Sequence, residues 1–256
     1  MQVLRHTGWM VVRQGRNLMR EPIWIAMMVI QPLIWLLLYG QLFSRVGALR
    51  GGATSYVEFL APGIICMNAF FGGSWSGMAM ITDLNRHVID RFLAAPVSRF
   101  AIVFSQVVRA GITAILQALL LLVVGLALGV RVHGGPLGWL VVFAAAGLLA
   151  MAFAGFSHGV ALIVRKEASM IATANFIGLP LMFISAILIP PKAMPHWIAV
   201  VSRFNPVNWG VQASRNAILT GGHWGSTGVY LLLLVAATGA TSLFATWCFR
   251  SYQRSI

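Results

Sequence analysis

Six apolar segments divide this chain of 256 residues, and each is about as long as a helix that crosses a lipid bilayer. A spanning helix needs about 20 consecutive apolar residues, and its backbone polar groups must bond to one another inside the hydrocarbon. No segment carries an acidic residue in its middle. This pattern predicts an all-α integral membrane protein with six transmembrane helices, in a single transmembrane domain over residues 1–256. The segments are Ile23–Phe43, Phe59–Thr82, Ile102–Gly129, Leu137–Val164, Ile171–Ile189 and Thr227–Phe249.

Composition and charge support this class. Hydrophobic residues make up 59% of the chain and charged residues 9%, whereas an average soluble domain is about 25% charged. The net charge of +13 would suit a nucleic-acid-binding protein, but the basic residues are scattered at the ends of the apolar segments and form no run. We therefore interpret them as orienting the protein in the membrane, and we expect no nucleic-acid partner.

The distribution of basic residues predicts the orientation. An even number of spans places both termini on one side of the membrane. Of the 18 Lys and Arg residues, 12 fall on that side and 6 on the other. The positive-inside bias then puts both termini in the cytoplasm.

A charged stretch, residues 83–96, separates the second and third apolar segments. At 100° per residue, Asp83, Arg86, His87 and Asp90 share one face, apolar residues cover the opposite face, and Pro96 ends the pattern. This predicts a solvated amphipathic helix on the cytoplasmic side. Two interpretations remain: an ordinary connection that carries positive-inside charge, or a docking site for a partner.

The first 21 residues form another amphipathic pattern. Arg5, Arg13, Arg16 and Arg20 fall within one arc of a helical wheel, and Trp9 lies on the same side. This predicts an interfacial helix on the cytoplasmic surface, bound to anionic membrane lipids. A role in contacting a partner protein is the alternative.

Residues 190–226 are too many for a tight turn and too apolar for a flexible loop. Pro195 and Pro206 each suit the first turn of a helix, and Gly221 with Gly222 suits a helix end. We therefore expect two short re-entrant helices that dip into the outer leaflet, between the fifth and sixth spans.

Polar residues and paired glycines inside the apolar segments predict contacts between helices. For Asn68, Ser74, Ser76, Asn175 and His158, an interhelical hydrogen bond is favoured over contact with a ligand. Glycines four residues apart would let helices approach closely. These pairs are Gly73 with Gly77, Gly125 with Gly129, and Gly155 with Gly159.

The residues for several kinds of chemistry are missing. Neither lysine can belong to a phosphate-binding loop, because Lys166 precedes Glu167 and Lys192 precedes Ala193. The six histidines show no metal-ligand spacing, and no catalytic triad can be assembled. We therefore expect no enzyme activity and no bound metal or cofactor. An ion-coupled carrier would need a carboxylate at depth, but all five acids are predicted to be peripheral: Glu21, Glu58, Asp83, Asp90 and Glu167.

Several stretches together resemble the permease subunits of ABC-2-type exporters, particularly the bacterial daunorubicin-resistance group. They are Ile30–Gly40 in the first segment, Asp90–Arg99 in the charged stretch, and Ser185–Pro191 with Phe204–Val207 near the fifth span. One departure is visible: His87-Val88 stands where relatives usually carry Gly-Thr.

The resemblance implies an export subunit in the bacterial inner membrane. A separate ABC subunit would bind ATP and Mg and power transport, and a second permease copy would complete the channel as a homodimer. Its cargo would be a hydrophobic drug-like or lipid-like molecule taken from the cytoplasm or inner leaflet. Lipid-linked glycan or lipid is the alternative cargo. Two other interpretations of the sequence remain open: a carrier independent of ATP, and a structural or insertase-like membrane protein.

The resemblance also implies roles for particular residues. Residues 83–96 become the coupling helix that contacts the ATPase, through Asp83, Arg86, His87, Asp90 and Arg91. The second and fifth spans line the substrate pathway, through Asn68, Phe71, Trp75, Asn175, Phe176 and Phe183. The re-entrant region forms an outer gate that includes Pro190, Pro191, Asn205 and Pro206.

Overall fold

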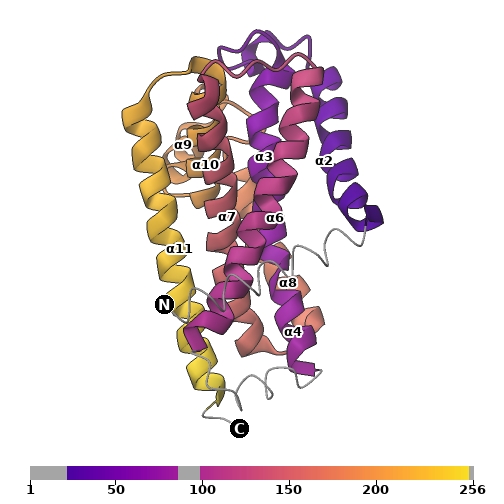
Figure 1. The fold of residues 1–256 in the computed structure, drawn as a ribbon. Helices are drawn as coiled ribbons and strands as arrows, with labels where there is room; N and C mark the ends of the chain where they lie inside the picture. Colours follow the sequence, from indigo (N-terminus) through magenta and orange to yellow (C-terminus); the bar gives the residue numbers. More distant parts are fainter. Residues whose placement is uncertain (1–21, 86–98, 254–256) are drawn as a thin grey trace.

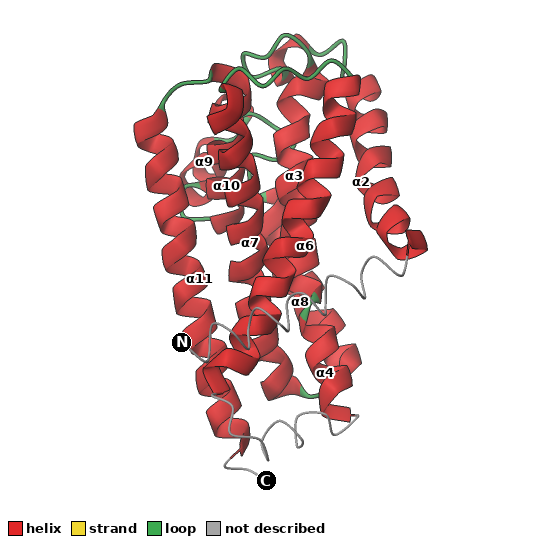
Figure 2. Ribbon diagram, viewed as in Figure 1, coloured by secondary structure: helices red, strands yellow, loops and turns green. Residues whose placement is uncertain are grey.

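The computed structural model describes residues 22–85 and 99–253 (Figure 1). Within these residues the chain is helical and contains no β-strand (Figure 2), which confirms the predicted all-α class. The interfacial helix predicted for residues 1–21 lies outside the described residues. So does most of the predicted coupling helix, including Arg86, His87, Asp90 and Arg91.

The long helices run side by side between two ends of the bundle (Figure 1). Among the described residues, four helical stretches are long and apolar enough to cross a membrane: Tyr56–Asn85, Ile102–Ala127, Gly135–Val164 and Trp224–Ser251. The first and fifth predicted spans overlap two shorter apolar stretches, Ile30–Leu42 of α2 and Glu167–Phe183, which is α8. The long elements are α2 (Pro22–Leu42), α3 (Tyr56–Trp75), α4 (Gly77–Asn85), α6 (Arg99–Ala127), α7 (Gly135–Val164), α8 (Glu167–Phe183) and α11 (Trp224–Gln253).

Two predicted spans differ in detail from the observed helices. The second predicted span is interrupted at Ser76, which separates α3 from α4. The fifth was expected to continue to Ile189, but α8 ends at Phe183 and residues 184–190 are not α-helical. Several backbone N–H and carbonyl groups of these residues form hydrogen bonds with side chains of other elements, and these bonds replace ones that a helix would supply.

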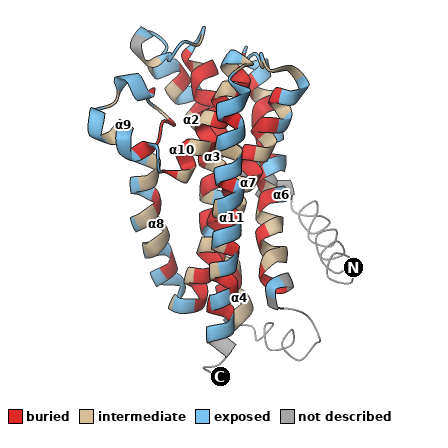
Figure 3. Ribbon diagram, turned by 90° about the vertical axis from the view of Figure 1, so that its left-hand side faces the viewer, coloured by how far each residue is buried: buried red, intermediate tan, exposed pale blue. Residues whose placement is uncertain are grey.

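The helix α7 lies at the centre of the bundle and packs against α3, α6, α10 and α11. Buried residues concentrate on the helix faces that point inward (Figure 3). A Cβ on Gly73 would collide with the backbone of Ala150 on α7, and one on Gly155 would lie 2.7 Å from Thr241 Oγ1 on α11. These small residues allow the close packing that their spacing predicts.

Of the four other glycines in the predicted pairs, two lie where helices come close together and two do not. Gly77 contacts Ser157 on α7, and Gly159 contacts Phe244 on α11, as expected. The pair Gly125 and Gly129 marks no close contact between helices. A Cβ on Gly125 would meet its nearest atom at an ordinary 3.6 Å, and Gly129 has a φ of +92° beyond the end of α6.

Two short helices follow α8, as the proline positions predicted. They are α9 (His196–Ser202) and α10 (Pro206–Arg215), and α10 continues into a π-helical turn, Asn216–Thr220. Gly221 ends this turn with a φ of +56°. Because α10 packs against α3, α7 and α11, it lies within the bundle rather than on its surface.

Candidate functional site

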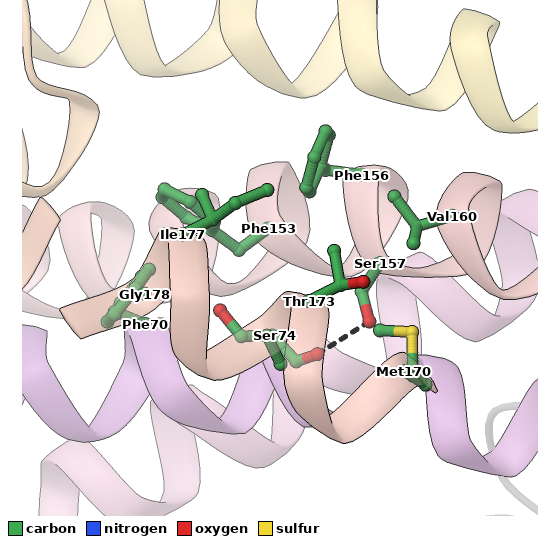
Figure 4. A pocket seen from close by; sticks show the side chains of 11 residues that line it. Phe70, Ser74, Phe153, Phe156, Ser157, Val160, Met170, Thr173, Ile177 and Gly178 are labelled. Carbon is green, nitrogen blue, oxygen red and sulfur yellow. Dashed lines mark hydrogen bonds between the residues drawn. The ribbon is translucent and has the colours of Figure 1, made fainter. Parts of the chain in front are cut away.

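A small hollow of about 20 Å³ lies between α3, α7 and α8 (Figure 4). Phe70 and Ser74 line it from α3, and Phe153, Phe156 and Ser157 line it from α7. The α8 residues in its wall recur at helical spacing, so one face of α8 is turned toward it. They are Met170, Thr173, Ala174, Ile177 and Gly178.

A second hollow continues the first along the inner face of α8. The two share Phe153, Phe156 and Ile177, and the second extends to Pro206 on α10 and Thr241 on α11. The combined groove is elongated and almost wholly apolar. Edge-to-face packing of Phe70 and Phe153, with ring centroids 4.5 Å apart, fixes its aromatic wall. Such a groove suits an apolar or aromatic molecule, with few groups available for hydrogen bonding.

The break between α3 and α4 lies at the edge of the first hollow. The Ser157 hydroxyl of α7 donates a hydrogen bond to the Ser74 carbonyl oxygen (2.6 Å) and accepts one from the Gly77 N–H (2.9 Å). Ser76 Oγ donates to the Gly73 carbonyl oxygen at 2.6 Å. Two backbone groups that flank the break are thus bonded by a side chain of another helix, which satisfies them inside an apolar bundle.

Non-helical residues 184–190 are held in a similar way by side chains from α3 and α10. Tyr56 Oη donates to the Leu188 carbonyl oxygen (3.0 Å), and Asn208 Oδ1 accepts from the Ala186 N–H (3.2 Å). Gly63 lets this segment approach α3, since a Cβ there would lie 2.6 Å from the Ile187 oxygen. Protein atoms therefore cover the irregular backbone, as its position in an apolar bundle requires.

A buried cation, Arg215, also binds the backbone of the non-helical residues 184–190. Arg215 at the end of α10 is 6% exposed and lies with its guanidinium carbon 3.7 Å from the centre of the Phe59 ring. Its Nη2 donates to the carbonyl oxygens of Phe59 and Ile187, both at 3.3 Å. The cation thereby joins α3, α10 and the non-helical segment.

Comparison with known proteins identifies the family. Residues 5–219 match the ABC-2 type transporter family. The chain is 30% identical over 235 residues to the daunorubicin resistance ABC transporter permease protein DrrB1 of Streptomyces coeruleorubidus, covering 91% of this chain and 80% of that protein. This chain belongs to the ABC-2 type transporter family. Two putative transport permeases ycf38 are also similar: that of Cyanophora paradoxa (32% identical, 80% of this chain, 71% of that protein) and that of Porphyra purpurea (27%, 84% and 74%).

The ABC-2 permease places the predicted pathway residues beside the groove rather than in its wall. Asn68 on α3 donates to Gln117 Oε1 on α6 at 3.0 Å, the kind of interhelical bond that its position indicated. Phe176 and Phe183 are 82% and 66% exposed. None of the six predicted residues lines either hollow; the others are Phe71, Trp75 and Asn175.

One predicted coupling residue is described. Asp83 lies on α4 near its end, where Gln106 Nε2 of α6 approaches its Oδ2 at 3.5 Å. It therefore stands where α4 leads toward residues 86–98.

The predicted outer-gate residues lie on either side of α9 along the chain. Pro190 and Pro191 end the non-helical segment and start a 3₁₀ turn, and Pro206 begins α10. Asn205 caps α10 by accepting from the Val207 N–H (2.9 Å) and donates to the Leu181 carbonyl oxygen of α8 (2.7 Å). A single side chain thus links the end of α8 to the start of α10.

Sequence reasoning missed the role of Arg215 and the burial of Glu58 by protein. Glu58 lies in the first turn of α3, where it is 2% exposed and accepts hydrogen bonds from Thr54 N (3.0 Å) and Thr54 Oγ1 (2.6 Å). Ser55 caps the same helix by accepting from the Glu58 N–H, and Ser55 with Glu58 is a recognisable helix-start signature. Arg215 had been counted only as a charge on the outer side, and nothing in its sequence surroundings signals burial.

Replacing Asn205 by alanine should destabilise the permease. The loss of the helix cap costs about 1–2 kcal/mol, and the loss of the bond to Leu181 about 1 kcal/mol more. Thermal unfolding in detergent would measure the change. In Asn205→Ser the hydroxyl can still accept from the Val207 N–H but is too short to reach the Leu181 carbonyl oxygen, so its midpoint should fall between those of wild type and Asn205→Ala. Equal losses in the two variants would show that the cap contributes nothing.

Proposed function

We propose that this permease is the membrane-spanning subunit of an ATP-driven exporter that moves a hydrophobic, drug-like molecule out of the cytoplasm or inner leaflet. The observation that carries this proposal is the apolar, aromatic groove of α3, α7 and α8 in a chain of the ABC-2 family. The daunorubicin resistance permease among its relatives is consistent with an aromatic cargo. Such a molecule gains free energy from burial against phenylalanine side chains, without needing charged partners.

Energy for transport would come from a separate ABC subunit that binds ATP and Mg. Family membership supports this partner, since the chain has no Walker lysine followed by Ser or Thr. Residues 83–96 would receive the movement of the ATPase through Asp83 and the charged residues that follow it. Both termini would then lie in the cytoplasm of a bacterial cell, with the inner membrane as its location.

A second permease copy would complete the transport route as a homodimer. Apolar side chains exposed on α2 and α8 would be available for contact with that copy: Leu38 (63% exposed), Leu42 (71%), Phe176 (82%) and Phe183 (66%). The predicted pathway residues on α3 and α8 would then face the partner, while α9 and α10 would form re-entrant helices and an outer gate. Lipid or lipid-linked glycan is the alternative cargo, since the elongated groove also suits an acyl chain.

The function can be tested in liposomes that contain the permease and its ABC ATP-binding subunit. Daunorubicin and a fluorescent phospholipid would be offered separately, and ATP hydrolysis and movement of the probe would be measured. We expect daunorubicin to stimulate hydrolysis and to move only when ATP is supplied. The control is an ATP-binding subunit whose Walker lysine is replaced by alanine. Stimulation by the phospholipid alone would establish the alternative cargo, and movement of either probe without ATP hydrolysis would overturn the proposal.

Replacing Phe156 by alanine should weaken the response to daunorubicin. The ring lines both hollows, and loss of one aromatic contact of about 1.4 kcal/mol corresponds to a tenfold rise in the half-maximal stimulating concentration. The matched control is Phe176→Ala on the opposite face of α8, which should leave that concentration within about twofold of wild type. The reverse outcome would place the cargo between two permease copies rather than in the groove.

A further inference from the structure

The hydroxyl of Ser157 belongs both to the wall of the first hollow and to the junction of α3 with α4 (Figure 4). It is 1% exposed and lies on α7, the central helix of the bundle. Its partners are backbone groups of Ser74 and Gly77, on either side of the break. Any molecule that fills the hollow therefore lies against the atoms that hold the break in its present geometry.

The junction is built for close contact with α7. A Cβ on Gly77 would lie 2.5 Å from Ser157 Oγ and 2.6 Å from the Ser157 carbonyl oxygen, so only glycine allows this approach. Ser74 also lines the hollow, so two of the three residues that make these bonds are accessible from it. Beyond the junction, α4 carries Asp83 toward the stretch that would contact the ATPase.

We propose that Ser157 is a cargo-sensing joint: an apolar group of a cargo molecule in the adjoining second hollow enters the first, displaces the Ser157 hydroxyl and so changes the angle at which α4 leaves α3. This inference rests on the proposed function, because it names how cargo binding reaches the ATPase. The cargo must bind the two arrangements of the α3–α4 break unequally, since a ligand shifts a conformational equilibrium only if it binds the two states unequally. A hydroxyl that bonds both sides of a helix break supplies that difference, because its two bonds hold one arrangement only.

The joint can be tested without knowing the cargo, by filling the hollow with a side chain. Ala174 lines the hollow from α8, whereas Ala172 is exposed on the opposite side of the same helix. Spin labels on Asn85→Cys and Ser251→Cys would report the position of α4 relative to α11. Both residues are exposed; Asn85 is the last residue of α4, and Ser251 lies near the end of α11. The native Cys66 and Cys248 are buried and stay in place.

We expect Ala174→Phe to shift the label-to-label distance by about 2 Å, the size of helix movements in switching proteins, and Ala172→Phe to leave it unchanged. Adding Ser157→Ala should abolish the response to Ala174→Phe. The matched control is Ser242→Ala, which removes a buried serine hydroxyl for which the described residues offer no hydrogen-bond partner, and should preserve the response. No shift in Ala174→Phe, or a full shift without the Ser157 hydroxyl, would overturn the proposal.

The same variants distinguish failure of the joint from failure of the proposed function. In the reconstituted complex, Ala174→Phe should raise ATP hydrolysis in the absence of cargo, and Ser157→Ala should prevent this rise. If the label distance responds as expected but no ABC subunit changes its hydrolysis rate, the joint stands and the exporter function is wrong. If the rate changes while the distance does not, the exporter function stands and the joint is wrong.

Discussion

Replacing Gly73 by alanine should cause one of the largest losses of stability that a single methyl group can produce in this bundle. Its Cβ would lie 3.1 Å from the Cα and carbonyl carbon of Ala150, and nearer still to the Ala150 oxygen. These are backbone atoms of α7, so no side chain can move aside and the two helices must separate. Overpacking of this kind costs about 1–3 kcal/mol. Thermal unfolding in detergent, followed by the yield of monodisperse protein, would measure it.

The adjacent glycine offers the matched control. Gly72 is exposed on α3, and a Cβ there would meet its nearest atom, Gln117 Oε1, at 3.9 Å. Gly72→Ala should therefore be neutral or stabilising, because alanine is favoured over glycine in a helix by about 1 kcal/mol. Equal destabilisation by the two substitutions would show that helix flexibility, rather than the contact with α7, is what glycine provides.

Replacing Arg215 by glutamate should prevent stable folding. The substitution would bury an anion beside the carbonyl oxygens of Phe59 and Ile187, which now accept hydrogen bonds from the guanidinium. Hydrogen bonds to a charged group each contribute about 1.5–3 kcal/mol, and an uncompensated buried charge costs about 3–5 kcal/mol. The total is comparable with the whole stability of many proteins. We expect loss of the monodisperse peak in size-exclusion chromatography.

Arg203 provides the control for this charge reversal. It is exposed after the end of α9, so Arg203→Glu should leave the chromatographic profile and the unfolding midpoint near those of wild type. Arg215→Lys keeps the charge but has a compact ammonium in place of the planar guanidinium, and should fall between the two. A folded Arg215→Glu protein would show that the cation does not hold residues 184–190.

The fold could be predicted from the sequence wherever helices were long and apolar, or where proline and glycine marked their ends. Pro206 begins α10 and Gly221 closes the turn after it, because proline suits the first helical turn and glycine suits positive φ. The end of α8 could not be predicted. Leu188 and Ile189 continue an apolar run, and the bonds that make a helix unnecessary there come from Tyr56, over 100 residues earlier.

Much less of the candidate site could be predicted. Pro206 was predicted from its local pattern to begin a helix, which the structure confirms, and Asn205 caps that helix. The groove depends on Phe153 and Phe156 of α7, which belong to a helix that is apolar all round. Such a helix gives no periodic signal to show which residues line a hollow, so the wall became visible only once α8 was placed.

Because α8 is short for a helix that crosses a membrane, we expect it to affect the lipid around it. Its 17 residues rise about 26 Å, whereas the hydrocarbon layer is about 30 Å thick. A bilayer that meets a short apolar helix thins locally to match it. The membrane beside this helix would therefore be narrower than elsewhere around the protein, which shortens the distance that an amphiphile must travel between leaflets at that side.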